Sequence, residues 1–384
     1  MRQKFDAIVV GGGAVGACAA LLLSVNGMRV ALIEPSEPTP WRDESRDLRV
    51  FAIAADSAAL LEEVGAWTLI ASRRAHAYTR MNVWDAGAPQ TPIEFDATAY
   101  ARPQLGWIVE NGLIQDSLWQ CLRQSPVHVV TGARVADVVQ NDSSVEVHLD
   151  SGETLTALRL LAADGGASTV RQKVGIACDL TAYGQRGVVA YIQHSASSQR
   201  TCWQRFLPTG PLAFLPVDDR LSSIVWSVPD ELASELLALD DEAFNVRLSN
   251  AFDGPLGDLR VASKRAAFPL QRQLAQSFVS GRVALIGDAA HVVHPLAGQG
   301  VNIGFRDVMA LRGLVSKWDD ETAWATWART RRSESALASH GFTGLNSLFS
   351  NDNVALTLLR GPALGIANRI PGLSHFFWRK AAGL

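Results

Sequence analysis

Three glycines near the start of the chain have the spacing of a phosphate-binding loop. Residues 5–10 (FDAIVV) form an apolar run that predicts a buried strand, and Gly11, Gly13 and Gly16 follow it in the pattern G-x-G-x-x-G. In such a loop the first glycine permits a tight turn and the second lets the backbone approach a pyrophosphate. The third lets the helix pack closely on the strand. The spacing therefore predicts a dinucleotide-binding loop.

A carboxylate stands where the same unit would need one. The glycines lead into a predicted helix over 14–25, with Gly27 as its C-terminal cap, and then into a strand over 29–33 that ends in Glu34. Glu34 follows Gly16 by eighteen residues, the position from which an acid binds an adenosine ribose hydroxyl. A glycine pattern alone is a weak signal. Strand, glycines, helix, strand and terminal acid in this order indicate a dinucleotide site.

A second candidate carboxylate lies in residues 282–305, RVALIGDAAHVVHPLAGQGVNIGF. Residues 283–286 predict a short strand that ends at the Gly287-Asp288 turn, and a helix is predicted after a bend rich in proline and glycine. Asp288 can accept a hydrogen bond from a ligand hydroxyl, and the N–H groups near Gly300 can face an electron-rich group. An ordinary strand–turn–helix with glycines for packing fits this stretch equally well when it is taken alone.

The composition is that of a globular protein and gives no sign of a nucleic-acid or metal site. Of 384 residues, 48% are apolar and 19% are charged, and the net charge of −3 gives no reason to expect a nucleic-acid partner. The four cysteines (Cys18, Cys121, Cys178 and Cys202) are far apart and form no C-x-x-C pair. We therefore predict neither a metal site nor a redox dithiol.

The N-terminus resembles a secretory signal only superficially. Arg2 and Lys4 precede an apolar stretch, but the glycine cluster interrupts it, and strand, loop, helix and strand account for the whole segment. The sequence also lacks an uninterrupted apolar run of about 18 residues, which a transmembrane helix would need. We expect a cytoplasmic protein of a bacterium.

The remaining pattern divides the chain into two folded units. Strands separated by turns are predicted between 127 and 163 and continue the first unit, whereas aromatic and β-branched segments between 187 and 228 predict an antiparallel sheet. The expected fold class is α/β, a Rossmann-like domain with an inserted antiparallel β-sheet domain and C-terminal helices. The predicted limits are 1–72 with 98–180 and 276–330 for the first domain, 73–97 with 181–275 for the second, and 331–384 for the helices.

Several stretches together resemble one enzyme family. The glycine loop with Glu34, the Asp164-Gly165…Arg171 motif and Gly287-Asp288 resemble the class A flavoprotein monooxygenases, the para-hydroxybenzoate hydroxylase superfamily. The sequence is most similar to the ubiquinone-biosynthesis hydroxylases within that superfamily. The stretches that carry this closer resemblance are DLRV (47–50), GAW (65–67), GWIVEN (106–111), residues 211–216, HVVHPLAGQGVN (291–302) and LFSN (348–351). The resemblance covers nearly the whole chain.

The resemblance implies a noncovalently bound FAD, with NAD(P)H as a transient co-substrate that has no Rossmann domain of its own. It assigns the ADP half to the glycine loop and Glu34, adenine to Val135, and the ribityl chain to Asp288. Arg49 and Glu110 would lie along the flavin side of the groove, and Asp164 and Arg171 would fix the groove and the incoming pyridine nucleotide. The implied FAD-binding residues are Gly11, Gly13, Ala14, Val15, Gly16, Glu34, Arg49, Glu110, Val135, Asp164, Gly287, Asp288, Pro295, Gly298, Gly300, Val301 and Asn302.

The reaction implied by the resemblance is hydroxylation of an aromatic ring. NAD(P)H reduces FAD, O2 gives a flavin hydroperoxide, and the ring of a polyprenylated phenol or benzoquinol attacks it in a pocket that excludes water. Trp203, Phe206 and Phe214 of the antiparallel sheet are the predicted substrate contacts, although core packing explains these aromatics equally well. No catalytic base is assigned, because His291 and His294 fit buried, hydrogen-bonded roles as well as proton transfer.

Other functions stay open on the same motifs. Flavin-dependent halogenases and polyprenyl reductases share the scaffold. The W-x-W-x-I-P segment of a halogenase is absent, and residues 226–229 (WSVP) resemble it only superficially. A noncatalytic flavoprotein subunit of a biosynthetic complex is an alternative of a different class, because flavin motifs indicate binding and not turnover.

The C-terminal residues 366–384 combine apolar and cationic side chains. At helical spacing one apolar face is formed by Ile366, Ile370, Leu373 and Phe377. Cations flank this face, as in a helix that lies at a membrane interface, although Pro371-Gly372 interrupts it. We predict weak, reversible contact with a membrane or with a multi-subunit ubiquinone-biosynthesis assembly. Packing of this face on the protein itself is an equally weighted alternative.

Overall fold

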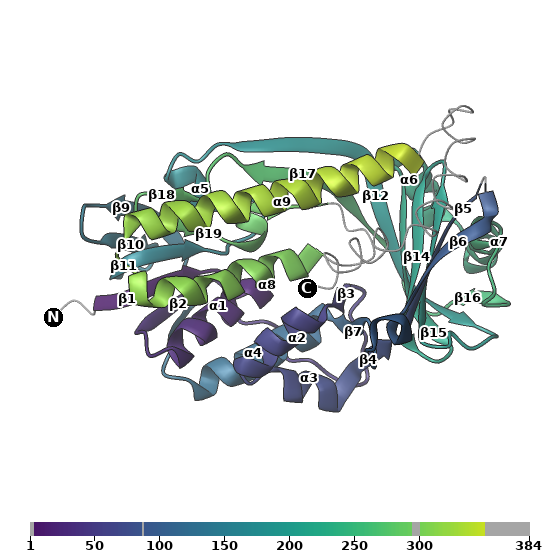
Figure 1. Cartoon of the computed structure of the whole chain (residues 1–384), viewed down its shortest axis with the longest axis horizontal. Helices are drawn as coiled ribbons and strands as arrows, with labels where there is room; N and C mark the ends of the chain where they lie inside the picture. The colour runs from purple at the N-terminus through teal and green to yellow at the C-terminus, as the bar shows by residue number, and fades with distance from the viewer. Residues whose placement is uncertain (1–3, 87, 294–299, 350–384) are drawn as a thin grey trace.

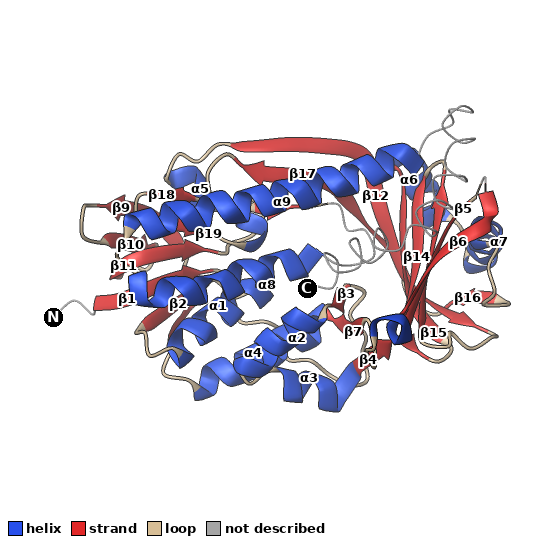
Figure 2. Ribbon diagram, viewed as in Figure 1, coloured by secondary structure: helices blue, strands red, loops and turns tan. Residues whose placement is uncertain are grey.

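The computed structural model describes residues 4–86, 88–293 and 300–349. Within these residues the chain forms two units that lie end to end along the long axis of the molecule (Figure 1). One unit contains an eight-stranded sheet with helices against it, and the other is built mainly of strands in a nine-stranded sheet (Figure 2). The predicted α/β class with an added antiparallel sheet is confirmed.

The eight-stranded sheet carries the glycine loop at the end of β1. Its order is β18-β19-β11-β1-β2-β8, with β10 beside β11 and β9 beside β10. β1 is parallel to both neighbours, so that Ile8 faces Leu160 of β11 and Ala31 of β2. Strands buried on both faces need unbroken apolar runs, which explains the sequence of β1. The strands are β1 (Lys4–Val10), β2 (Val30–Glu34), β8 (His128–Thr131), β9 (Val135–Gln140), β10 (Val145–Leu149), β11 (Thr154–Ala162), β18 (Val279–Ser280) and β19 (Val283–Leu285).

Small residues allow helix α1 (Ala14–Val25) to lie close to its neighbours. Ala17, Ala19 and Ala20 are fully buried, and α1 packs on β1, α4 and α8. The other helices of this unit are α2 (Ala55–Glu63), α3 (Trp67–Arg74), α4 (Asn111–Gln124), α5 (Thr169–Lys173), α8 (Gly300–Leu311) and α9 (Glu321–Phe349), with 3-10 turns η2 (Gly287–Ala289) and η4 (Arg312–Lys317). A further 3-10 turn, η1 (Ala97–Tyr100), directly follows a strand of the nine-stranded sheet. Among the described helices, none combines the length and the apolarity needed to cross a bilayer.

Two long strands, β12 and β17, connect the first unit with the nine-stranded sheet (Figure 1). The order of that sheet is β20-β17-β12-β15-β14-β13-β5-β6, with β16 beside β12. Helices α6 (Asp230–Ala238) and α7 (Asp241–Phe252) cover one face. The strands are β5 (Arg80–Asp85), β6 (Ala88–Asp96), β12 (Cys178–His194), β13 (Thr201–Leu207), β14 (Gly210–Asp218), β15 (Leu221–Pro229), β16 (Leu259–Val261), β17 (Ala266–Ala275) and β20 (His291–Val292). A small sheet, β3 (Val50–Ile53), β7 (Gly106–Glu110) and β4 (Ala75–Tyr78), is antiparallel.

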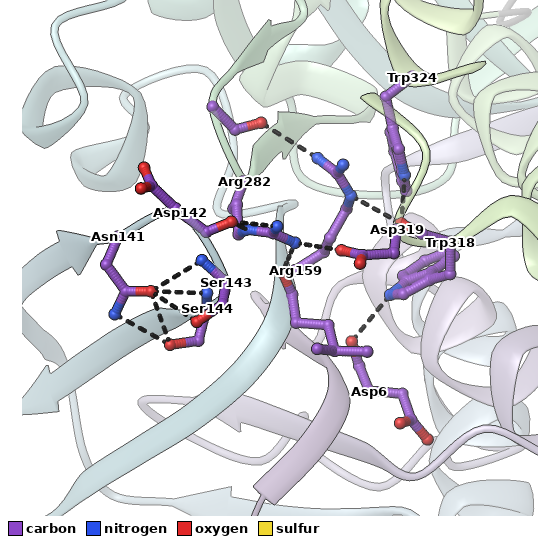
Figure 3. A network of polar contacts seen from close by, with 12 residues as sticks. Asp6, Asn141, Asp142, Ser143, Ser144, Arg159, Arg282, Trp318, Asp319 and Trp324 are labelled. Atoms are coloured by element: carbon purple, nitrogen blue, oxygen red, sulfur yellow. Dashed lines mark hydrogen bonds and ion pairs between the residues drawn. The ribbon is translucent and has the colours of Figure 1, made fainter. Parts of the chain in front are cut away.

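A buried arginine ties the start of α9 to the eight-stranded sheet (Figure 3). Arg159 of β11 is 1% exposed; its Nε donates to the Trp318 carbonyl at 2.8 Å and its Nη1 to the Gly281 carbonyl at 3.1 Å. Its guanidinium lies 4.8 Å from the ring centre of Trp324. Burial, together with the neighbouring positive charge of Arg282, lowers the pKa of Arg159. Carbonyl oxygens and an aromatic face therefore replace water around this cation.

The strand pairings bear on the predicted domain limits. β5, β6 and β12 to β17 lie in the nine-stranded sheet, whereas β4 pairs with β7 in the small sheet. The predicted limit between residues 330 and 331 falls inside α9, so it would assign one part of this helix to the first domain and the rest to the C-terminal helices. The predicted amphipathic segment at 366–384 lies outside the described residues. The domain limits stay predictions.

Candidate active site

A cavity of about 460 Å³ lies where the two units meet. The start of α1 (Gly13 to Val15) and the turn at Asp288 form part of its wall on the first unit. Val189 and Val225 of the nine-stranded sheet line it from the second unit. Residues that are far apart in the sequence and were predicted to share a site, Gly13 and Asp288 among them, thus border one cavity.

The three loop glycines are required for different reasons. Gly11 has φ +104°, and a Cβ there would overlap the Ala163 carbonyl; a Cβ at Gly16 would overlap the Gly11 carbonyl. Gly13 has an ordinary φ of −65°, and the nearest atom to a Cβ there would be Nε2 of Gln115, at 3.9 Å. Packing therefore demands Gly11 and Gly16, whereas Gly13 leaves open room at the N-terminus of α1. An anion that approaches the backbone would use this room.

The carboxylate of Glu34 lies against the glycine loop. Its Oε2 accepts from the Gly12 N–H at 2.5 Å and its Oε1 from the Ser36 N–H at 3.2 Å. Trp119 of α4 holds the loop from the other side, because its Nε1 donates to the Gly12 carbonyl at 2.8 Å. The sequence did not indicate this role, since Trp119 looks like any core residue of an apolar helix. Val135 on β9 is half-buried and does not line the cavity.

Asp288 is the exposed member of a buried segment. The residues from Arg282 to Ala290 are all buried except Asp288, whose side chain is exposed at the cavity. Gly287 has φ +58°, and a Cβ there would lie 3.1 Å from Cγ1 of Val15, so that the turn needs glycine. Gly300 and Val301 at the start of α8 also line the cavity. Pro295 and Gly298 lie outside the described residues.

Arg49 and Glu110 were both predicted to lie along the groove, and the structure separates them. Arg49 lines the cavity with its guanidinium 5.2 Å from the Phe51 ring centre, and in the described part of the chain it has no carboxylate partner. Glu110 does not line the cavity. It is 3% exposed and lies 3.2 Å from Arg74, and its Oε2 accepts from the Asp47 N–H at 2.9 Å. Glu110 thus positions the segment that presents Arg49.

Three further predicted residues hold backbone around the cavity and do not face it. Asn302 uses both ends of its amide, accepting from the Ala54 N–H at 3.0 Å and donating to the Ala52 carbonyl at 2.8 Å. Asp164 accepts from the Val170 N–H at 3.1 Å, in the first turn of α5, whose N-cap is Ser168. Buried Arg171 donates to the carbonyls of Ala289, at 2.8 Å, and Gly166, at 2.9 Å. These contacts hold in place the turns that carry the lining residues.

The three predicted substrate contacts lie away from this cavity, and their role stays a prediction. Phe214 is fully buried on the face of the sheet that packs against α7, where its ring centre lies 4.2 Å from that of Phe252. Trp203 packs in the same cluster, and Phe206 packs against Val83 and Ile93. None of the three lines the cavity. The strands that carry them, β13 and β14, contribute no residue to the lining of the cavity. The second unit contributes Gly187, Val189, Val225, Phe268 and Leu270.

Comparison with known proteins identifies the family. A family model described as "FAD binding domain" matches residues 4–327. The chain is 35% identical to 3-demethoxyubiquinol 3-hydroxylase of Escherichia coli, over 100% of both chains. It is 33% identical to ubiquinone hydroxylase UbiL of Rhodospirillum rubrum, over 98% of this chain and 89% of the other. The chain belongs to the ubiquinone-biosynthesis hydroxylases. It is an FAD-dependent monooxygenase, as the sequence resemblance implied.

A solved structure shares the fold of this hydroxylase. The p-nitrophenol 4-monooxygenase PnpA from Pseudomonas putida superposes with a TM-score of 0.78 and 20% identity, over 100% of this chain and 99% of that chain. The cavity of the hydroxylase fits FAD on its own geometry. Gly13 leaves room for a pyrophosphate, Arg49 supplies an uncompensated cation, and Asp288 supplies an exposed acceptor.

Replacing Asp288 with alanine is expected to weaken FAD binding by tenfold to a hundredfold. A charge-assisted hydrogen bond to a hydroxyl is worth about 1.5–3 kcal/mol, and about 1.4 kcal/mol corresponds to one decade of affinity. Titration of the apoprotein with FAD measures the effect. Asp288→Asn keeps an acceptor and should lose less affinity than Asp288→Ala. Equal and unchanged affinities in both variants would place Asp288 outside the cofactor site.

Proposed function

We propose that this enzyme hydroxylates the ring of a polyprenylated phenol or benzoquinol with NAD(P)H and O2. The observation that carries the proposal is the two-sided character of the cavity. Arg49, Asp288 and the N-terminus of α1 offer charge and hydrogen bonds on one side, whereas Val189, Val225 and Leu270 make the other side apolar. The names of the relatives, a demethoxyubiquinol hydroxylase and a ubiquinone hydroxylase, support this substrate class.

Some residues of the cavity would bind the cofactor, and others would hold the substrate. The redox chemistry, reduction by NAD(P)H and transfer of one oxygen atom of O2, comes from bound FAD. Arg49 and the N–H groups at the start of α1 would bind the pyrophosphate, and Asp288 would orient the ribityl chain. The apolar wall at Val189 and Val225 would hold the aromatic ring and exclude water from the reacting atoms.

The test is NAD(P)H oxidation with and without a polyprenylated phenol, combined with analysis of the product. Oxidation that is stimulated by the phenol and yields one hydroxyl per NAD(P)H consumed supports the proposal. A protein that binds FAD but shows no phenol-dependent oxidation would be a noncatalytic flavoprotein subunit. The quinone intermediate that accumulates in a deletion strain then identifies the ring carbon that is hydroxylated.

We also propose that residues 366–384 bring the enzyme to its poorly soluble substrate. A polyprenylated phenol resides in a bilayer or on a partner that shields its tail, so the enzyme needs a reversible contact with one of them. The apolar face of this segment, flanked by Arg369, Arg379 and Lys380, has the composition of an interfacial helix. The enzyme would thus act at the cytoplasmic surface of a bacterial inner membrane.

Truncation after Ala363 is expected to abolish turnover of a long-chain phenol while turnover of a short-chain, soluble phenol persists. The physical reason is that the short substrate needs no docking surface. FAD content and thermal unfolding of the truncated protein are measured beside the full chain. Loss of flavin or of folding in the truncated protein would show instead that residues 364–384 pack on the protein itself.

A further inference from the structure

A single buried carboxylate joins three segments next to the cavity. Asp307 of α8 is fully buried, and its Oδ2 accepts from the Gly287 N–H at 2.9 Å and from Nε2 of His291 at 2.6 Å. Its Oδ1 accepts from Nε of Arg331 of α9 at 2.8 Å. An isolated carboxylate at such a position would be strongly disfavoured, so its donors must be held in place as firmly as the carboxylate itself.

The charges around Asp307 keep it ionised. Burial alone would raise the pKa of the carboxyl, but the attraction of His291 and Arg331 and the hydrogen bonds from His291 and Gly287 outweigh it, and the pKa lies below its usual range. An ionised carboxylate accepts hydrogen bonds through both oxygens and donates none. Asp307 can therefore satisfy all three donors together, which neither a protonated acid nor an amide does equally well.

The groups that donate to Asp307 lie at the cavity, and they determine how its lining side chains are oriented. Gly287 directly precedes Asp288, and the N–H of Gly287 is the atom that Asp307 holds. His291 lines the cavity; Nε2 is engaged by Asp307, so Nδ1 is the ring nitrogen left to meet a ligand. The ring also lies against Phe278, with 5.8 Å between ring centres. Neither donor can turn without breaking its bond to Asp307.

We propose that Asp307 is the positioning residue of the cofactor site. By holding the Gly287 N–H it fixes the direction of the Asp288 carboxylate, and by holding Nε2 it fixes the His291 ring. Through Arg331, which also donates to the Ile303 carbonyl at 3.3 Å, the position of the turn depends on helix α9. This inference rests on the proposed placement of FAD beside Asp288.

The test is a double-mutant cycle with FAD affinity of the apoprotein as the readout. Asp307→Asn is nearly isosteric with the native residue, but it loses the charge and replaces one acceptor with a donor. We expect it to weaken FAD binding by about tenfold in the native background and by clearly less in Asp288→Ala, because the part of its effect that acts through Asp288 is then already lost and only the part through His291 remains. The visible absorbance bands of bound flavin should shift in Asp307→Asn, since the contacts of the cofactor change.

The outcomes separate the positioning role from the cofactor placement. If Asp307→Asn weakens binding equally in both backgrounds, Asp307 does not act through Asp288 and the inference is overturned, while the placement of FAD stands. If Asp288→Ala itself leaves affinity unchanged, the placement and the inference fall together. Should Asp307→Asn fail to fold, Arg331→Lys replaces it in the same cycle, because lysine keeps a cation beside Asp307 but loses the guanidinium geometry.

Discussion

Replacing Gly13 with aspartate is expected to give a folded protein that binds no FAD. The Gly13 backbone is in a conformation open to any residue, and the nearest protein atom to a Cβ there would be Nε2 of Gln115, at 3.9 Å. Aspartate is among the preferred residues at the start of a helix, so α1 should form at least as well as before. A carboxylate in the open space would block and repel the pyrophosphate. We expect a loss of at least about a hundredfold in affinity, or about 2.8 kcal/mol.

Visible flavin absorbance, titration with FAD and thermal unfolding of the apoprotein measure this effect. The matched control is Gly313→Asp, because Gly313 is an exposed glycine with open space around it, and it lies in η4. The control should keep both its FAD and its stability. Full FAD occupancy in Gly13→Asp would show that the pyrophosphate does not lie at the start of α1.

Replacing Arg159 with alanine is expected to cost about 3–5 kcal/mol of unfolding free energy. The change removes the hydrogen bonds to the carbonyls of Trp318 and Gly281, of which the first keeps Nε1 of Trp324 as a donor at 2.9 Å, and it opens a cavity against Trp324. Arg159→Met fills most of the volume and removes the buried charge, so it should cost less than Arg159→Ala. Denaturant unfolding of the apoprotein measures both variants.

An exposed arginine on the same helix provides the comparison for this result. Arg329 of α9 is exposed and contacts Thr326 on its own helix at 3.2 Å, so Arg329→Ala should change stability by no more than about 0.5 kcal/mol. If Arg159→Ala is as mild as Arg329→Ala, the buried guanidinium does not join α9 to the sheet.

Part of the site could be predicted from short stretches of the sequence. The glycine loop, Glu34 and Asp288 stand at the ends of strands, and an apolar run followed by a turn marks such an end in the sequence itself. Gly13 could be distinguished from Gly11 and Gly16 only once the neighbouring atoms were known. The sequence gives the spacing of the three glycines but not the open space beside one of them.

The wall on the substrate side could not be predicted, for a physical reason. β14 is buried on both faces along most of its length, because α6 and α7 cover one face and the first unit adjoins the other. Alternation of apolar and polar residues shows which side of a strand faces water, but here neither side does. The sequence therefore could not show which face of β14 carries Phe214, and in the structure the Phe214 ring packs against Phe252 of α7.

Polar residues close to a motif were assigned to the ligand too readily. Asn302 and Glu110 lie within recognisable motifs, yet Asn302 bonds to backbone groups and Glu110 to a backbone N–H and the half-buried Arg74. Conversely, Asp307 and Trp119 gave no local signal. Their roles come from partners in distant segments, and spacing along one helix does not reveal such pairings.

Strands β12 and β17 form a two-stranded ribbon that couples the two units, so we expect the units to unfold together. One continuous ladder pairs Cys178 with Ala275 at one end and Val189 with Ala266 at the other, across an irregularity between Ala182 and Gln185. Both strands run from one unit into the other, so a hydrogen-bonded ladder connects the units where a single linker would leave them free to reorient. Neither unit can be excised with intact edges.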